Sequence, residues 1–372
     1  MARPVRVLMV LTVRYGKNGI TNCVMNYASR LDPARVRCDL VCPNEPGKEA
    51  RTLIGRTGGE VFVLAGRNRR PLAYLRALSR LVRDRGEEVV HAHGNSATLA
   101  VELLAAKRGG AKVRLPHSHN TTCSMKLADR LLRGVFDRLS TGAVACSAAA
   151  GDWLFPKRPY EVLNNAIDAE RFRFSEAARA EMRSRLGVLP EEVLFLQVGA
   201  FNAQKNQAFL IEAFRLLLER RENCRLLLVG DGERRAAVEA RAEAWKIAKR
   251  VDFLGLRDDI PALLSAADAF TLPSLHEGLP LTLVEAQCAG LPCLASDRVT
   301  REAALTDLVS YAGIESAETF AAALANMVDV DRKAASDEAI ACAREAGYDV
   351  SQNAEELMRL YERLACAQRE ID

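Results

Sequence analysis

Strand-length apolar runs that alternate with helix-length segments constrain the fold more than any other feature of this chain. The first run, Val5 to Leu11, leads into a glycine-containing loop at 14–19 and then into a helix expected from about Thr21 to Leu31. Continuous apolar runs are typical of parallel strands that are buried on both faces. A strand, a glycine loop and a helix in this order open a doubly wound α/β domain.

The alternation starts again near Val193, so we expect two α/β domains. A chain of 372 residues is too long for one ordinary domain and about right for two. The polar stretch 165–190 between the halves is interpreted as a connection with a short helix. Two such halves imply a cleft, and open parallel sheets bind ligands beyond the carboxyl ends of their strands. Strands are expected near 5–11, 37–42, 60–64, 88–92, 112–117 and 142–146, and then near 193–198, 226–229, 251–253, 269–272 and 292–295.

Composition argues against several classes of protein. Apolar residues make up 49% and charged residues 27%, as in an ordinary globular chain. No apolar run approaches the roughly 20 residues of a membrane span, and no cleavage site follows the N-terminus. We therefore expect a cytoplasmic protein. The ten cysteines contain no C-x-x-C pair, so they are expected to be reduced, mostly buried thiols and not zinc ligands.

Charge is distributed unevenly between the halves. Residues 1–172 hold 28 Lys and Arg against 15 Asp and Glu, a net charge of +13, and the remainder carries −9. The basic half favours an anionic membrane surface or an anionic acceptor, and no nucleic acid is expected. A helix expected over Arg67 to Arg85 has many arginines. It is either a solvated basic face or a helix that lies on a membrane surface.

The segment from Leu272 to Ala286 is the most informative. A strand ends at Leu272, and Pro280 is expected as the first residue of a helix, where its missing N–H costs nothing. The amides near this helix start, those of Gly278, Leu279 and Leu281, would then form an anion site.

Two carboxylates occur in this segment. Glu277 precedes the helix, and Glu285 lies inside its otherwise apolar run. A buried carboxylate is costly unless something binds it, and sugar or ribose hydroxyls are natural partners. The alternative interpretation is a capping carboxylate and a structural ion pair.

Two further loops follow strands of the second half. In one, Gly199 would let a ligand approach the backbone, and Lys205 is a compact cation that suits a phosphate, unless it is simply an exposed loop lysine. In the other, Gly230-Asp231-Gly232 predicts a tight turn. Arg235 stands where a G-x-G-x-x-G fingerprint requires its third glycine, which argues against a nicotinamide oxidoreductase.

Four of the five histidines form two pairs near strand ends, His91 with His93 and His117 with His119. A spacing of two residues puts each pair on one sheet face. No carboxylate or cysteine accompanies them at ligand spacing, so packed or hydrogen-bonded histidines are favoured over a metal site. His119 is the candidate for contact with substrate.

These motifs resemble the retaining glycosyltransferases of family 4, which have the GT-B fold of two facing Rossmann-like domains. The most specific element is E-x7-E, from Glu277 to Glu285 within H-E-G-L-P-L-T-L-V-E-A. V-G-A-F-N-A-Q-K-N, L-V-G-D-G-E, V-D-F-L-G and A-D-A-F-T-L-P-S support it, as do H-S-H-N-T, A-C-S and L-N-N-A-I-D-A-E-R-F in the first half. The combination looks most like the bacterial capsule and exopolysaccharide branch.

The resemblance implies a function and a domain plan. An acceptor-binding domain would span 1–172 and a nucleotide-sugar-binding domain 173–350, and a helix within 351–372 would cross back to the first domain. The enzyme would move a hexose with retention from a nucleoside-diphosphate sugar, by default a UDP-sugar, to a saccharide or lipid-linked saccharide. This reaction belongs to cell-surface polysaccharide synthesis, without cofactor or metal, and would place the protein on the inner face of the cytoplasmic membrane.

The resemblance also implies residue roles. Glu277 would lie by the donor sugar, His119 would contact the sugar, and Lys205 would contact the diphosphate. The donor would also be held by Gly19, Gly199, Gly278, Leu279, Glu285 and Phe253, with Gly19 closing over the phosphates, Glu285 on the ribose and Phe253 near the base.

The chain departs from the family pattern at two places. Ala200 stands where an arginine usually follows the glycine, and Asn18 replaces one glycine of the first loop. Other interpretations therefore stay open: a sugar-nucleotide epimerase or hydrolase, and a non-catalytic nucleotide-sugar-binding partner of another transferase.

Overall fold

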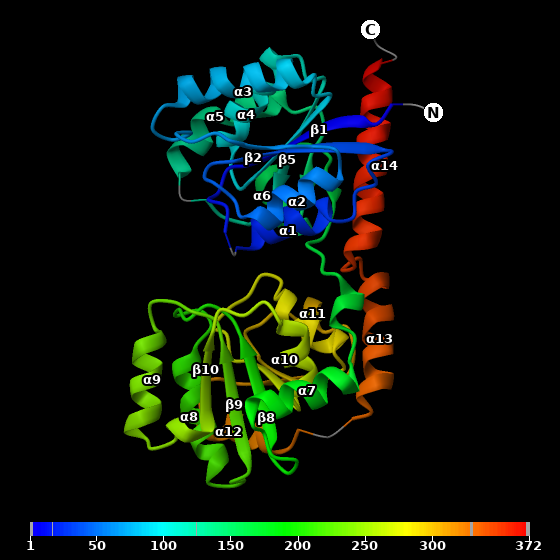
Figure 1. Ribbon diagram of the computed structural model, residues 1–372. Helices are drawn as coiled ribbons and strands as arrows, with labels where there is room; N and C mark the ends of the chain where they lie inside the picture. Colours follow the sequence, from blue (N-terminus) through cyan, green and yellow to red (C-terminus); the bar gives the residue numbers. More distant parts are fainter. Residues whose placement is uncertain (1–2, 17, 124, 328–329, 370–372) are drawn as a thin grey trace. The chain divides into compact units, whose positions relative to one another are not determined.

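The computed structural model describes residues 3–16, 18–123, 125–327 and 330–369 (Figure 1). They form two compact units, the first comprising Met1–Ala166 with Asp349–Asp372, and the second Ile167–Tyr348. Lys17, part of the first glycine loop, lies outside the described residues.

The first unit is built around a sheet of seven parallel strands in the order β3-β2-β1-β4-β5-β6-β7. Its strands are β1 (Val5–Leu11), β2 (Val36–Cys42), β3 (Val61–Val63), β4 (Val89–Gly94), β5 (Val113–Ser118), β6 (Val144–Ala145) and β7 (Glu161–Val162). Its helices are α1 (Gly19–Ala28), α2 (Lys48–Arg56), α3 (Pro71–Arg85), α4 (Ala100–Gly109), α5 (Lys126–Leu139), α6 (Ala148–Leu154) and α14 (Val350–Arg369).

The second unit repeats the plan with six parallel strands in the order β10-β9-β8-β11-β12-β13. Its strands are β8 (Val193–Val198), β9 (Cys224–Val229), β10 (Val251–Gly255), β11 (Ala269–Leu272), β12 (Cys293–Ser296) and β13 (Val309–Ala312). Its helices are α7 (Glu176–Leu186), α8 (Gln207–Leu218), α9 (Arg235–Ala244), α10 (Ile260–Ala266), α11 (Leu281–Cys288), α12 (Ala317–Ala325) and α13 (Arg332–Glu345). The prediction of two Rossmann-like α/β domains is confirmed.

The unit boundaries differ by a few residues from the predicted ones at 172 and 350. Ile167 and Phe172 are buried in the core of the second unit, and the Ile167 amide donates to the Tyr348 carbonyl at 2.9 Å. The second unit therefore begins at Ile167, where buried apolar residues join its core. The polar stretch that starts at residue 165 does not mark this boundary.

Helix α14 packs on the first unit, although it follows the second in sequence. Leu357, Met358 and Tyr361 are buried in the core that covers one face of the first sheet. Arg35, which precedes β2, pairs with Glu355 at 2.6 Å and Glu362 at 2.7 Å on the same helix. Burial and charge pairing both attach α14 to this unit.

The cysteines match the expectation of reduced, mostly buried thiols. All ten cysteines are free thiols, and seven of them are buried. Among the described residues, no helix is both long and apolar enough to cross a membrane.

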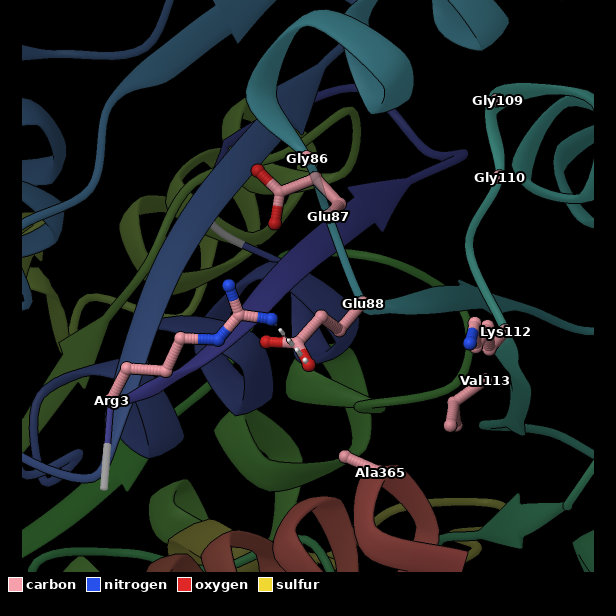
Figure 2. A pocket seen from close by; sticks show the side chains of 9 residues that line it. All are labelled: Arg3, Gly86, Glu87, Glu88, Gly109, Gly110, Lys112, Val113 and Ala365. Atoms are coloured by element: carbon pink, nitrogen blue, oxygen red, sulfur yellow. Dashed lines mark ion pairs between the residues drawn. The ribbon is translucent and has the colours of Figure 1, made fainter. Parts of the chain in front are cut away.

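A pocket of about 260 Å³ lies beside the amino ends of β4 and β5 in the first unit (Figure 2). Arg3 and Glu88 line it and form an ion pair at 3.6 Å. Glu87 lines it too, and burial beside Asp39 raises the pKa of Glu87 to about 9. Because parallel sheets bind ligands at the opposite, carboxyl edge, this pocket is not the expected site.

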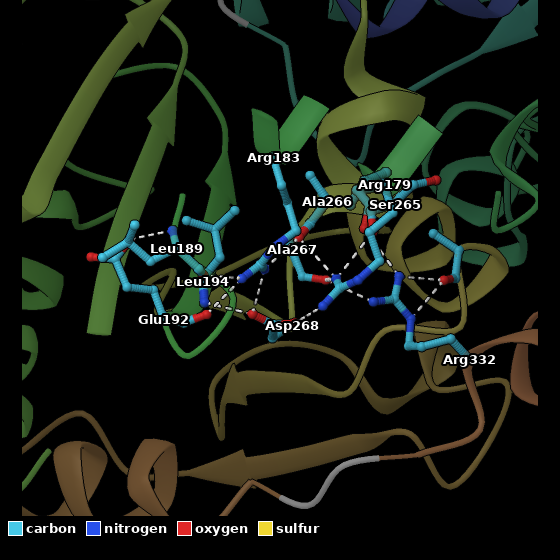
Figure 3. Close-up of polar contacts among 12 residues, drawn as sticks. Arg179, Arg183, Leu189, Glu192, Leu194, Ser265, Ala266, Ala267, Asp268 and Arg332 are labelled. Carbon is cyan, nitrogen blue, oxygen red and sulfur yellow. Dashed lines mark hydrogen bonds and ion pairs between the residues drawn. The ribbon is translucent and has the colours of Figure 1, made fainter. Parts of the chain in front are cut away.

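The amino edge of the second sheet is held by an arginine network (Figure 3). Asp268 accepts from Arg179 at 2.5 Å, from Arg183 at 3.0 Å and from the Leu194 amide at 2.7 Å. Arg332 donates to the carbonyls of α10 and α11 at their C-terminal ends. These contacts attach α7 to the sheet and α13 to α10 and α11, far from the carboxyl edge of the sheet.

Replacing Asp268 by alanine should lower the free energy of unfolding by about 1–3 kcal/mol, because Arg179, Arg183 and a main-chain amide lose their shared acceptor. Urea denaturation followed by circular dichroism measures this loss. Asp307→Ala, at an exposed carboxylate with no ion pair among the described residues, is the control. Equal stability of the two variants would contradict the assigned role of the network.

Candidate functional site

The carboxyl ends of β8 and β11 form the point at which strand order reverses in the second sheet. Ligands of doubly wound folds bind at this point, because the loops there diverge to opposite faces of the sheet. The loop after β8 carries Gly199 and Lys205, and the loop after β11 carries Glu277. The fold thus brings two separate sequence motifs to one edge.

An ion pair joins the two loops. Lys205 Nζ lies 2.7 Å from Glu277 Oε1, and these side chains are only 16% and 9% exposed. Gln204 Nε2 donates to Glu277 Oε2 at 3.1 Å and to the His276 carbonyl at 2.9 Å. The alternative of an exposed, solvated loop lysine is therefore wrong. Sequence reasoning missed Gln204, which no motif distinguishes.

The loop after β8 determines where Lys205 lies. The Lys205 amide donates to Asn202 Oδ1 at 3.0 Å, and its carbonyl accepts from Gln197 Nε2 at 2.9 Å. A Cβ at Gly199 would come within 3.1 Å of two carbons of the Lys205 side chain. The lysine stem thus packs directly over Gly199, and a side chain here would force it to shift by a few tenths of an ångström.

The main chain before α11 is open. An added Cβ at Gly278 would meet no atom of the described residues within 4 Å. Helix α11 begins at Leu281, and the prediction that Pro280 is its first residue is wrong by one position. Pro280 is the N-cap with ψ 89°, which is outside the helical range. The amides of Leu281 and Thr282 begin the helix, where no intrahelical acceptor exists.

Glu285 lies one turn into α11. Among the described residues its carboxyl group has no hydrogen-bond partner. Burial raises the pKa of Glu285 to about 7, and the nearby charges of Arg171 and Lys205 oppose that rise. A carboxyl group that is half-buried without partners is suited to accept hydrogen bonds from a ligand.

Phe253 on β10 packs against Phe201 in the loop after β8, with ring centroids 6.2 Å apart. Its carbonyl accepts from Arg235 Nη2 at 3.3 Å. Leu279 is partly buried against the core beneath α11. The second unit alone therefore holds Gly199, Lys205, Glu277, Gly278, Leu279, Glu285 and Phe253.

Gly19 and His119 belong to the first unit. Gly19 is the first residue of α1, and the Asn18 side chain caps this helix by accepting from the Thr21 amide at 3.0 Å. This cap explains the asparagine that replaces the expected glycine. His119 follows β5 and is half-buried, and burial lowers its pKa to about 4, so the ring is neutral at pH 7.

The ionisation of Glu285 should make folding stability depend on pH. Its folded-state pKa of about 7 exceeds the ordinary 4.5, so the carboxyl group destabilises the folded state as pH rises through this interval. Without ligand, Glu285→Gln should match the wild type near pH 5 and exceed its free energy of unfolding by about 1–3 kcal/mol at pH 8.

Urea denaturation between pH 5 and pH 8 checks this expectation. Glu191→Gln, at an exposed carboxylate, should follow the wild type at every pH. A Glu285→Gln variant that keeps a constant stability difference from the wild type across this range would show that the carboxyl group is ordinarily solvated.

Comparisons with known proteins cover both units of the chain. Residues 178–339 match the family described as Glycosyl transferases group 1, and residues 17–171 match Glycosyltransferase Family 4. "Putative glycosyltransferase EpsF" of Bacillus subtilis is 33% identical over 375 residues, 96% of each chain. An Escherichia coli UDP-Gal:alpha-D-GlcNAc-diphosphoundecaprenol alpha-1,3-galactosyltransferase is 29% identical over 237 residues, 59% of this chain and 60% of that protein.

The fold has solved counterparts. Anabaena Alr3699/HepE, crystallised with UDP and glucose, superposes with a TM-score of 0.77 at 18% identity, over 96% of this chain and 100% of that one. At that identity the likeness shows the fold only. Together with full-length similarity to EpsF and the two family matches, it shows that this chain belongs to the family 4 glycosyltransferases of the GT-B fold.

Proposed function

We propose that the protein transfers a hexose from a UDP-sugar to a saccharide or lipid-linked saccharide acceptor in cell-surface polysaccharide synthesis, with retention of configuration. The observation that carries the proposal is the half-buried Glu285 carboxyl group, which has no hydrogen-bond partner among the described residues and lies at the edge that also carries Lys205 and Glu277. Two relatives support the choice of donor and acceptor. HepE was crystallised with UDP, and the Escherichia coli relative is named for UDP-Gal and a diphosphoundecaprenol-linked sugar.

In this proposal the second unit stabilises the leaving nucleoside diphosphate. Departure of the diphosphate develops negative charge, and a fixed cation with helix amides stabilises such charge without reorganisation. Lys205 supplies the cation, and the amides of Leu279 and Leu281 supply donors. Gly278 leaves room for the phosphates. Because Lys205 and these amides stabilise the negative charge, no metal ion or cofactor is required.

The two carboxylates then have separate roles. Glu285 accepts hydrogen bonds from the ribose hydroxyls, which offsets the cost of its burial. Glu277, held by Lys205 and Gln204, faces the donor sugar near the reacting centre. The retained configuration follows from attack on the face that the diphosphate leaves, with a leaving phosphate oxygen accepting the proton of the acceptor hydroxyl.

The remaining candidates complete the donor site in the same proposal. Gly199 leaves room for the Lys205 stem, Phe253 lies near the base, Gly19 closes over the phosphates and His119 contacts the sugar. Ala200 removes one cation that the family usually has. We propose that Lys205 and the helix amides suffice, with Arg171 adding positive charge near Glu285.

We further propose that the protein is cytoplasmic and binds the membrane peripherally through α5. Leu127 and Leu131 are each 73% exposed and Val135 is 44% exposed, and their spacing puts them in one stripe. Exposed Lys126 and Arg130 lie beside this stripe, which suits an anionic lipid surface. Of the two interpretations of 67–85, the solvated basic face fits α3, which buries its apolar face at Leu75, Leu78 and Val82.

Calorimetric titration tests the donor site. Without added metal, UDP should bind the wild type with a micromolar dissociation constant and GDP more weakly. Glu285→Ala and Lys205→Ala should each weaken UDP binding about 10–100-fold, because each removes a charged hydrogen-bonding partner. Glu191→Ala should bind UDP like the wild type.

Incubation with UDP-sugars and acceptors separates the alternatives. Free sugar released without acceptor would indicate a hydrolase, an altered sugar on UDP would indicate an epimerase, and tight binding without turnover would indicate a non-catalytic partner. If neither UDP nor GDP binds, the proposed donor site is wrong.

Flotation with vesicles of phosphatidylglycerol and phosphatidylcholine tests the membrane surface. Leu127→Glu with Leu131→Glu should abolish binding, because both substitutions put charge where apolar surface would enter the bilayer. The control, Leu72→Glu with Leu189→Glu, changes two leucines that are 69% and 54% exposed elsewhere. Equal binding by the two double variants would contradict the role of α5.

A further inference from the structure

Four histidines form one row on a face of the first sheet. The register of β4 and β5 sets His93 directly beside His117, and His91 precedes His93 by two residues on the same face. The ring centroids of His91 and His93 lie 4.2 Å apart, those of His93 and His117 5.1 Å, and those of His117 and His119 4.1 Å. In the sequence alone these histidines form two separate pairs. Parallel pairing of the strands makes them one cluster.

Some ring nitrogens of this row form hydrogen bonds, and others have no hydrogen-bond partner in the part of the chain that the structure describes. His91 Nδ1 bonds to the Tyr361 hydroxyl at 2.6 Å, and His93 Nδ1 bonds to His119 Nε2 at 3.0 Å. The Nε2 atoms of His91 and His93 and both ring nitrogens of His117 are buried, with no hydrogen-bond partner among the described residues. All three side chains are fully buried. Leaving such groups unsatisfied is costly in a folded protein.

One hydrogen-bonded ring nitrogen beside a second nitrogen without a described partner, as in His91 and His93, is typical of metal-binding histidines. A histidine that binds a metal through one nitrogen usually donates its other N–H to an acceptor, which fixes the ring. Tyr361 can accept from His91 in this way, and His119 can accept from His93. One available nitrogen from each of His91, His93 and His117 lies within 4.8 Å of the others.

We propose that His91, His93 and His117 bind one divalent transition-metal ion of the zinc class. Three imidazoles without a carboxylate favour zinc, cobalt or nickel over magnesium or calcium. Three ligands leave a coordination position open to water or another ligand. The ion would hold the Nδ1 proton of His93 toward His119 and so orient His119. The inference rests on the first unit and does not require the proposed function.

Metal titration of the full-length, tag-free protein tests the site after chelator treatment and dialysis. Cobalt should bind at one ion per chain, with absorption bands typical of nitrogen coordination, and zinc should displace it. His117→Gln should weaken zinc binding by at least about 100-fold, because it removes a ligand and breaks none of the hydrogen bonds of the row. His276→Gln is the matched control, since it changes the one remaining histidine, which is exposed.

A second variant keeps the test decisive if His117→Gln does not fold. Tyr361→Phe retains all three ligands and should weaken zinc binding about 10–100-fold, because His91 loses its orienting partner. Zinc should also raise the melting temperature of the wild type and of His276→Gln. It should raise the melting temperature of Tyr361→Phe by a smaller amount. Less than half an ion per chain, or equal zinc affinity in the wild type and every folded variant of the row, would overturn the proposal.

Discussion

Parallel pairing of neighbouring strands is the constraint on which the functional parts of this protein depend. Because the carboxyl ends of β8 and β11 meet at one edge, Lys205 and Glu277 become partners although they are far apart in sequence. The same pairing of β4 with β5 assembles the histidine row of the first unit. The proximity of the residues in each set follows from strand order, because no local sequence motif shows which strands are neighbours.

The candidate donor site combines features that stability alone would not favour. Glu285 is half-buried without a hydrogen-bond partner among the described residues, and its pKa is raised to about 7 as a result. Lys205 lies over Gly199, and its main chain is held by hydrogen bonds to Asn202 and Gln197. The arginine network around Asp268 lies at the opposite edge of the sheet, where it joins α7 to the start of β11 (Figure 3). At the carboxyl edge, the Glu285 carboxyl group thus remains available to a ligand.

The sequence predicted the repeated α/β pattern and the residues at the carboxyl edge of the second sheet, because buried parallel strands and glycine loops leave clear local signals. It did not predict Gln204 as the partner of Glu277, since that contact depends on how two loops approach each other. It also missed the exposed apolar stripe on α5, because leucines on a helix suggest burial until the packing is known. The histidine row was missed because only the register of the strands shows that the two pairs are neighbours.

Hydrogen–deuterium exchange with and without UDP tests the central claim most directly, because it locates the nucleotide on the chain. We expect slower exchange in the loop after β8, around Lys205, and in the segment from Glu277 to Glu285, with little change at the amino edge near Asp268. Protection confined to other segments, or no protection at saturating UDP, would contradict the assignment of this edge as the donor site.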